Sequence, residues 1–464
     1  MGISSLGVGS NVLTQDVIDQ LKAADESQYV QPITNNISTE KSKAGQLNII
    51  NALMDNLTES TGNVSQYGLF DTRTATATGS AVSVTANAGS DIQDFSITVN
   101  NLATKEIEQS GSFSSATSTI ASGDGEMKLS VGSKDFTFNY NAAMTLSDLK
   151  DQINKDAGNT VQASIVEVGA NDFRLFLTSA DTGTGHDISI SDNDSGLDDQ
   201  LKADTDTTDG YTNVQSATDA SFKYNGLDIT RKSNTVSDLL SGVTIQLKES
   251  GTSDVSVKQD VGGIEDKLDS FVSKFNSAIT QLNTMTKSSQ DAKERGTFSN
   301  DTTIKAMKNN IINMVGTAGD SVGGRLADYG FASNRDGTIS LDHSKFEEKL
   351  KENPNNVEAF FSGGTFVESN GSTKSIDGAF DQMKNTLDRY TRYNGSLDQL
   401  KTSYSTRISS LEDQKQQATD RLTSKYNIMA KRFAAYDLMI SKINSASSIF
   451  TQLANAQAAS ASGG

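Results

Sequence analysis

The segment "SNRDGTISLDHS" comes nearer to a metal-binding pattern than any other stretch of this sequence. Its Asn334, Asp336 and Gly337 resemble part of a calcium loop, in which a glycine at the sixth position allows a sharp turn. With Gly337 at that position, the first and twelfth positions fall on Ala332 and His343, so both key carboxylates are missing. We therefore expect an Asp-Gly hairpin turn here and no bound cation.

Other polar clusters also lack the spacing of a catalytic or metal site. The acidic stretch from Ser191 to Gly210 has no fixed ligand pattern, and His186 and His343 stand in no metal-binding motif. The absence of cysteine excludes disulfides, thiolate metal ligands and cysteine nucleophiles. A Ser-His-Asp triad assembles only in the fold, and nothing in the sequence marks one. We expect no enzyme activity, no metal and no cofactor.

The formal net charge of the 464-residue chain is −18, which bears on its partners. An acidic surface repels phosphate backbones and argues against binding to nucleic acid. No apolar run approaches the roughly 20 residues that a membrane-spanning helix needs, so we expect no membrane insertion. The sequence opens without the basic region and cleavage motif of a secretory signal, and composition alone suggests a cytosolic protein.

From about Asp71 to Val261 the chain alternates with the period of two that β-strands require. The segments "DFSITVNNL", "DFRLFLTS" and "GVTIQLKE" are typical of half-buried antiparallel strands. In "MKLSVGSKDFTFNY" two alternating runs flank a turn at Gly132, and "FKYNGLDI" carries the strong hairpin signal Asn225-Gly226.

Two places in this region look like variants of one unit. In each, a hairpin leads to a Thr with an Asp three residues later, at Thr145–Leu149 and at Thr235–Leu239. This spacing is an acidic variant of the capping box and predicts a helix start at both places. The segments indicate two related β-rich lobes; the alternative is that both are ordinary capped helices.

Outside this region the apolar residues repeat with helical spacing. One heptad seam runs after the strands, and we expect it to form the core of a helical bundle through Ile264, Leu268, Phe271, Phe275 and Leu282. Another stripe, near the N-terminus, contains Ala44, Leu47, Ile50, Met54 and Leu57. The longest run, from Leu397 to Phe450, holds neither Pro nor a helix-breaking Gly.

These stripes predict an α+β, multidomain fold. Since an isolated helix is only marginally stable in water, the stripes must cover one another, and this requires the two ends of the chain to meet. We expect a discontinuous helical bundle or coiled-coil leg, built from both chain ends, with antiparallel β-rich head domains inserted in the middle. The expected parts are flexible terminal arms (1–40 with 430–464), a leg (41–70 with 262–429), one head domain (71–105 with 215–261) and a second head domain (106–214).

Several segments, in order along the chain, resemble flagellar hook-associated protein 2, the filament-capping family. They are the opening "SSLGVGSN…VIDQLKAAD", the run "FDTRTATATGSAVSVTANAGSDIQDFSITVNNLAT", the return "NGLDITRKSNTVSDLLSGVTIQLKES" and the signature "YGFASNRDGTISLDHSKFEEKLKENPNNVEAFFSG". The segment "TLSDLKDQINKDAGNTVQASIVEVGANDFRLFLTSADTGTGHDISI" looks like the flagellar hook IN motif, with Ile153-Asn154 as its namesake pair. Together these segments span most of the chain.

The resemblance implies a structural protein that is exported through the flagellar apparatus to the filament tip. It implies a ring of several copies, five by the family's usual description, that helps exported flagellin to fold and insert and prevents its loss. It also implies contacts with hook–filament junction proteins and with an export chaperone at the C-terminal region. Two alternatives remain open from the sequence: a hook–filament junction protein, and a surface adhesin whose head binds host glycan or mucus.

The resemblance also gives the terminal stripes a role, because in this family the termini order only on assembly. We expect the terminal helices to contact neighbouring subunits, since a chain end has few local partners. The expected interface residues are Val17, Leu21, Leu422, Met429, Phe433, Tyr436, Ile440 and Ile443.

Overall fold

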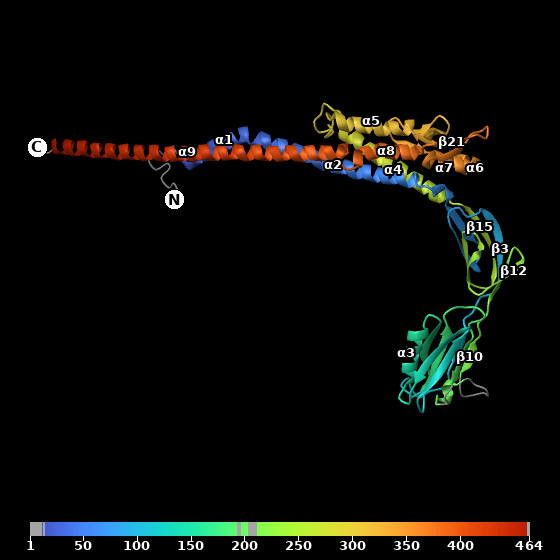
Figure 1. The fold of residues 1–464 in the computed structure, drawn as a ribbon. Coiled ribbons are helices and arrows are strands. Elements are labelled where there is room, and N and C mark those ends of the chain that lie inside the picture. Colours follow the sequence, from blue (N-terminus) through green and yellow to red (C-terminus); the bar gives the residue numbers. More distant parts are fainter. Residues whose placement is uncertain (1–11, 13, 193–195, 203–210, 462–464) are drawn as a thin grey trace. The chain divides into compact units, whose positions relative to one another are not determined.

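The computed structural model describes residue 12 and residues 14–192, 196–202 and 211–461 (Figure 1). Its chain divides into two compact units, one formed by residues 1–67 and 264–464 and the other by residues 68–263. The first unit is mainly helical and the second is built from antiparallel strands, so the α+β class predicted from the sequence is confirmed. The loose opening arm falls on residues 1–11, outside the described part.

The first lobe of the β-rich unit consists of two antiparallel sheets. A five-stranded sheet has the order β1-β15-β3-β11-β12, and a three-stranded sheet has the order β13-β14-β2. Their apolar faces enclose a core that includes Phe95, Ile97 and Phe222. The bounds of the strands are β1 Arg73–Ala77, β2 Val82–Ala86, β3 Gln93–Asn101, β11 Ala220–Tyr224, β12 Leu227–Arg231, β13 Thr235–Leu240, β14 Val243–Leu247 and β15 Gly251–Gln259.

The second lobe has its own core, which includes Met127, Leu149 and Leu177. Its sheets have the orders β10-β4-β8-β7 and β6-β5-β9, and helix α3 packs beside β7. The bounds are β4 Ile107–Gln109, β5 Gly125–Val131, β6 Lys134–Tyr140, α3 Leu146–Ala157, β7 Val161–Gly169, β8 Asp172–Ser179, β9 Ile188–Asp192 and β10 Thr212–Gln215. Short 3₁₀ turns lie at Leu69–Asp71 and Asp199–Leu201.

The turn chemistry read from the sequence is confirmed at both hairpins. Asn225 and Gly226 adopt φ values of 45° and 86°, the positive values that their two-residue turn requires. Gly132 joins β5 to β6 with φ 60°, and a Cβ at this position would meet the backbone oxygen of Gly185. At the third turn, Gly337 has φ 85° between β18 and β19.

One of the two predicted helix starts is wrong. Thr145 begins α3 with a complete capping box, in which Thr145 and Asp148 bond each other's backbone N–H groups. Thr235–Leu240 instead forms strand β13. There, Val236 pairs with Ile245 of β14 and is 1% exposed, while Asp238 binds Arg231 and caps no helix. Core burial of a β-branched residue thus outweighs the local capping signal.

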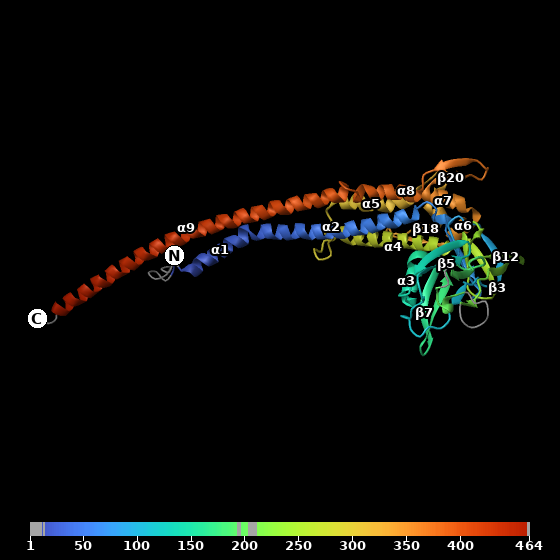
Figure 2. The ribbon, with the colours of Figure 1, turned by 60° about the horizontal axis from the view of Figure 1, so that its bottom comes forward.

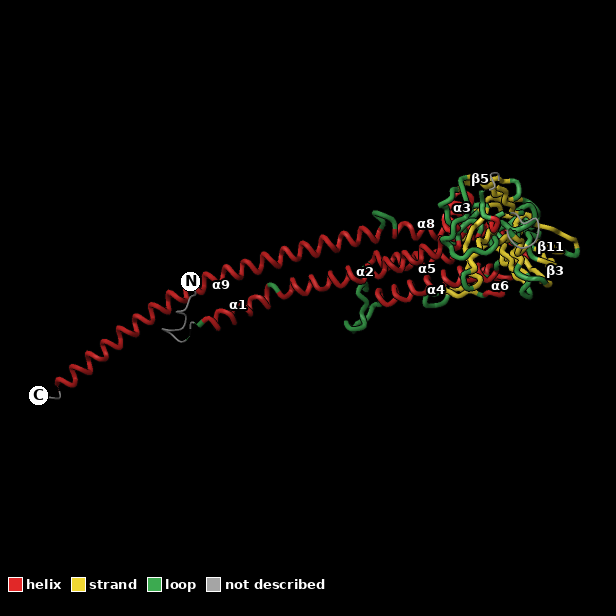
Figure 3. The backbone as a smooth tube through the Cα atoms, turned by 90° about the horizontal axis from the view of Figure 1, so that it is seen from below, coloured by secondary structure: helices red, strands yellow, loops and turns green. Residues whose placement is uncertain are grey.

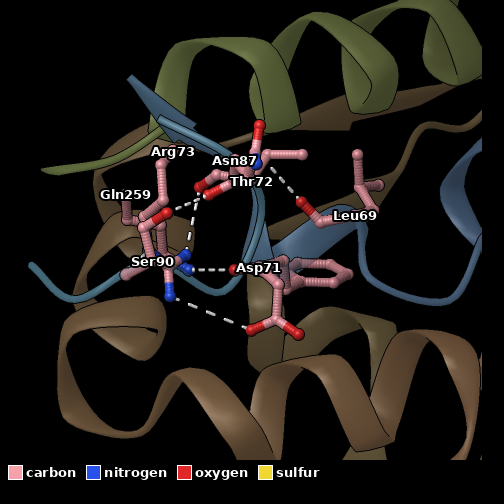
Figure 4. A network of polar contacts seen from close by, with 8 residues as sticks. Leu69, Asp71, Thr72, Arg73, Asn87, Ser90 and Gln259 are labelled. Carbon is pink, nitrogen blue, oxygen red and sulfur yellow. Dashed lines mark hydrogen bonds and ion pairs between the residues drawn. The ribbon is translucent and has the colours of Figure 1, made fainter. Parts of the chain in front are cut away.

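A polar network fixes the start of β1 (Figure 4). The Nε of Arg73 donates to the Ser90 carbonyl at 2.9 Å, and one of its terminal nitrogens donates to the Thr72 carbonyl at 3.1 Å. The Ser90 hydroxyl donates in turn to the Asn87 carbonyl at 2.7 Å. The long arginine side chain therefore ties the first strand to the loop that follows β2.

The Ile153-Asn154 pair has a direct structural role in the second lobe. Ile153 is fully buried in the core. Beside it, the Asn154 amide donates to the carbonyl oxygen of Ala163 and accepts from its N–H, both at 2.8 Å. Because β7 is an edge strand, this pair of bonds occupies backbone groups that would otherwise face water.

Replacing Asn154 with Ala is expected to lower the free energy of unfolding of the β-rich unit by about 1 kcal/mol, the usual net value of a hydrogen bond or two near the surface. Denaturant unfolding followed by circular dichroism measures this change. The control is Asn159→Ala, a nearby exposed asparagine. Equal, negligible effects of the two substitutions would show that the hydrogen bonds between Asn154 and Ala163 do not stabilise the lobe.

The helical unit is a bundle in which α2 lies along α8 and α9 (Figure 2). Its long helices are α1 Gln15–Tyr29, α2 Gln31–Val64, α4 Val261–Thr286, α5 Thr302–Thr317, α8 Ala379–Thr391 and α9 Ser396–Ala461. The smaller elements are β16 Gly319–Asp320, β17 Gly324–Arg325, a 3₁₀ turn at Leu326–Tyr329, β18 Phe331–Ser333, β19 Ile339–Leu341, α6 His343–Glu352, α7 Pro354–Ser362, β20 Gly364–Val367 and β21 Thr373–Ile376.

Aromatic side chains form a cluster between α4, α7 and α8 in this bundle. Phe271 of α4 lies edge-on to Phe380 of α8 at a ring distance of 4.8 Å, and Phe361 of α7 stacks on Phe380 at 5.3 Å. Phe331 completes the cluster at 6.3 Å from Phe271. Rings at these distances attract beyond their area of burial, so the cluster joins helices that are far apart in sequence.

Both prolines stand where a helix begins. Pro32 lies in the first turn of α2, directly after the break at Val30, and Pro354 opens α7. A proline has no N–H to donate, and the first helical turn does not need one. The N-terminal helical stretch is therefore divided into α1 and α2 at this point.

Candidate assembly surface on the terminal helices

Helix α1 packs against the middle of α9 within the same chain. Ile18, Leu422, Tyr426 and Ala430 are each less than 9% exposed and form one apolar cluster. Val30, Met429 and Phe433 pack around it, partly buried. This cluster, which we call the terminal seam, joins the two ends of the chain.

A polar clasp fixes the register of the terminal seam. The carboxylate of Asp25 accepts hydrogen bonds from the Lys425 ammonium at 2.6 Å and from the Tyr426 hydroxyl at 2.8 Å. The lysine bond, with the tyrosine bond second, lowers the pKa of Asp25, and the same contact raises the pKa of Lys425. Burial, followed by the bond to Asp25, raises the pKa of Tyr426.

Beyond the terminal seam, α9 continues past the start of α1 (Figures 1 and 3). The helix is 66 residues long, about 100 Å at 1.5 Å per residue. Its last part carries large apolar side chains that are more than half exposed: Tyr436, Leu438, Met439, Ile443, Ile449, Phe450 and Leu453. We call this set the apolar end of α9. Contiguous exposed apolar surface of this kind marks a site of association.

The expected interface residues fall into three groups in the structure. Leu21, Tyr436 and Ile443 are exposed by 44%, 56% and 60%. Leu422 is buried in the terminal seam of its own chain. The remaining residues of the expected set are partly buried: Val17, Met429, Phe433 and Ile440.

The sequence reading missed the residues of α1 that contact α9. Ile18 is 2% exposed and Asp25 lies seven residues further on, both facing α9. The stripe of Val17, Leu21 and Ala24 that stands out in the sequence lies beside this face. The seven-residue spacing of Ile18 and Asp25 is typical of a helix–helix contact. A search for apolar repeats does not find it, because Asp25 is charged.

The residues expected in the bundle core lie there. Each of Ile264, Leu268, Phe271, Phe275 and Leu282 has no exposed surface. All of them lie on α4, where Phe271 belongs to the aromatic cluster and the ring of Phe275 lies 6.0 Å from that of Phe271.

The polar groups near this bundle form structural contacts. Asp336 accepts bonds from the N–H and hydroxyl of Thr338 at 3.0 and 2.6 Å, closing the turn that resembled a calcium loop. His343 lies between Glu265 and Asp269, at 3.0 and 3.2 Å, and the bond to Glu265 raises its pKa. Among the described residues, no group of three or more His, Asp or Glu side chains is arranged to hold a metal ion.

Comparisons with known proteins agree with this architecture. The family model described as flagellar hook-associated protein 2 N-terminus matches residues 10–106, and the model of its C-terminus matches residues 217–445. A flagellar hook-associated protein 2 from Campylobacter jejuni is 29% identical over 85% of this chain and 68% of its own length. One from Escherichia coli is 26% identical over 97% of both chains.

Among solved structures, a crystal structure of the flagellar cap protein FliD from Escherichia coli, comprising its D1, D2 and D3 domains, has a TM-score of 0.62. It is 23% identical and covers 78% of this chain and 99% of its own, which supports the fold. In the present chain, the N-terminal family model matches before the C-terminal one, and together the two models cover more than half of the residues. The chain therefore belongs to the flagellar hook-associated protein 2 family.

Proposed function

We propose that this chain assembles into a ring at the distal end of the flagellar filament, held there by its terminal helices, and assists the folding and insertion of exported flagellin. As a member of this family, the chain is a flagellar filament cap protein that reaches the filament tip through the flagellar export apparatus. None of the helices in the described part is long and apolar enough to span a membrane.

The observation that carries the proposal is the apolar end of α9. Burying a large apolar side chain stabilises an association by roughly 1.5–3 kcal/mol, and this segment offers seven such side chains on one helix. A protein that remained a monomer would keep this surface in water at a large cost in free energy. The surface therefore fits a subunit that is completed by its neighbours.

The parts of the chain take different tasks in this proposal. The terminal arms (1–40 with 430–464) make the contacts of assembly, and the leg (41–70 with 262–429) carries them on a rigid bundle. The two head domains (71–105 with 215–261, and 106–214) form a plate over the growing end. Separate cores in the two lobes and in the bundle support this division.

We infer the following partners: further copies of the chain in a closed ring of five, flagellin, the hook–filament junction proteins and an export chaperone at the C-terminal region. A ring requires heterologous contacts that close. The proposal is structural and assigns no bond chemistry. The comparisons favour this reading over a junction protein and give no support to a host-binding adhesin.

A strain that lacks its own copy of this gene tests the proposal. Supplied with the full chain, it is expected to grow long filaments and to retain flagellin. Without the chain, we expect short or missing filaments and monomeric flagellin in the medium, measured by immunoblotting of the culture supernatant. Normal filaments in the strain without the chain would overturn the proposed function.

A further inference from the structure

Helix α1 retains an apolar stripe after it has packed on α9. Its contact face contains Ile18 and Asp25, whereas Val17, Leu21 and Ala24 lie on the adjoining side. Leu21 is 44% exposed, Ala24 is exposed and Val17 is half-buried. Steps of four and three residues keep these three side chains in line along the helix.

Helix α9 has a matching stripe on a side away from the terminal seam. Ile428, Ala435, Met439 and Ala446 follow one another at spacings of seven, four and seven residues, the repeat of a helix–helix contact. All four are exposed, Ile428 by 53% and Met439 by 60%. Ile428 precedes the seam residue Met429, and one helical step of about 100° separates their directions. We call this set the outer stripe of α9.

The two stripes differ in the charge around them. Although the whole chain has a net charge of −18, α9 from residue 421 onward is basic. Its charged residues are Arg421, Lys425, Lys431, Arg432 and Lys442, with one acidic residue, Asp437, which is buried. Helix α1 is acidic, with Asp16, Asp19, Asp25 and Glu26 against one basic residue, Lys22.

The exposed charges extend a pairing that the chain already uses. Within one chain, Lys425 binds Asp25 across the terminal seam. Lys431 and Lys442 are exposed beside the outer stripe of α9, and Asp16 is exposed on α1, one helical step of about 100° from Val17. A second α1 on the outer stripe would place the Asp16 carboxylate near these lysines. Complementary charge of this kind sets partner and orientation.

We propose that the stripe of Val17, Leu21 and Ala24 in one copy packs on the outer stripe of α9 in the next copy. Two different surfaces meet in this contact, and its head-to-tail repetition generates a ring when the rotation closes. A stripe packed on its own copy would instead place acidic α1 on acidic α1, or basic α9 on basic α9, and the charges oppose both. The proposal rests on the proposed function, because it names the partner of the terminal helices in the ring.

Cysteine cross-linking tests this contact, and the chain's lack of cysteine makes each introduced thiol unique. The experiment mixes full-length Leu21→Cys with a tagged full-length Ile428→Cys and then oxidises the assembled protein. We expect a disulfide-linked dimer of one tagged and one untagged chain. Such a dimer is intermolecular by construction, because each copy carries one thiol. The matched control is Asn427→Cys, an exposed neighbour whose side chain points about 100° away.

Each other outcome overturns the proposal. Dimers of Leu21→Cys with itself, or of Ile428→Cys with itself, would show that each stripe packs on its own copy. Assemblies that sediment only as dimers would show a reciprocal two-fold contact in place of a ring. Equal cross-linking by Asn427→Cys would show random collision. Oligomers that form, as seen by sedimentation, without a mixed cross-link would place the contact elsewhere and leave the cap function intact.

Reversing the charges gives a second, independent readout. Lys431→Glu with Lys442→Glu is expected to raise the concentration needed for assembly by about tenfold, since several weak attractions become repulsions. Adding Asp16→Lys to that same chain is expected to restore part of the assembly, because it returns an attraction between opposite charges. Lys293→Glu with Lys374→Glu, two exposed lysines elsewhere in the helical unit, controls for net charge. Failure of Asp16→Lys to restore any assembly would contradict the proposed pairing.

Failure of this inference and failure of the cap function give different results. If the chain does not cap filaments, flagellin is lost even from cells that carry the unaltered chain. If only the contact is wrong, those cells retain flagellin while the mixed cross-link is absent.

Discussion

Replacing Phe271 with Ala is expected to lower the free energy of unfolding of the helical unit by about 3–5 kcal/mol, the range for removing a large aromatic side chain from a core. Phe271 has no exposed surface and contacts the rings of Phe275, Phe331 and Phe380. The cavity left behind lies among the ring of Phe275 on the same helix and the rings of Phe331 and Phe380 from two other segments. Chemical denaturation followed by circular dichroism measures the loss.

The control for this substitution is Tyr393→Ala, which removes an aromatic ring that is 87% exposed. Its expected effect is within about 0.5 kcal/mol, as for most surface positions. If the two substitutions destabilise the chain equally, Phe271 does not lie in the core described here.

Replacing Ile443 and Phe450 with Ser is expected to abolish capping while leaving the monomer intact. The two side chains are 60% and 72% exposed, so their loss removes little packing from the free chain, and its melting temperature should hardly change. In an assembled cap, each truncation of a side chain that is buried between subunits is expected to weaken the free energy of association by roughly 2–5 kcal/mol. We expect the variant to be exported, to form no rings and to release flagellin into the medium.

The matched control is Leu422→Ser, which alters a residue buried in the terminal seam of one chain. This variant is expected to loosen α1 from α9, and it should increase proteolysis of α1 in the free monomer. Early melting of the Ile443→Ser, Phe450→Ser monomer would contradict the assignment of the apolar end of α9 to assembly. Rings formed by that variant would contradict it equally.

Much of the fold follows from local chemistry that the sequence displays. The Asn225-Gly226 turn, the capping box of Thr145 and Asp148, and the heptad seam through Phe271 each depend on neighbours within a few residues or turns. Such signals survive folding because tertiary contacts reinforce them. The order of strands in each sheet depends on long-range pairing and was not predicted.

The errors at the site have a common physical cause. Thr235–Leu240 carries a capping pattern, yet pairing with β14 and burial of Val236 make it a strand. In α1 the contact of Ile18 and Asp25 with α9 of the same chain was not foreseen, while the expected contact of Val17 and Leu21 with a neighbouring subunit stays a prediction. In both places a distant partner decides, and one sequence does not show that partner.

Immunogold labelling of native filaments with antibodies to this chain tests the central claim most directly. We expect gold particles at the free end of each filament, with none along its length. In cells that carry the Ile443→Ser, Phe450→Ser variant, the label should leave the filament and appear in the medium with flagellin. Label at the hook end or along the shaft would contradict the assignment of this chain to the filament cap.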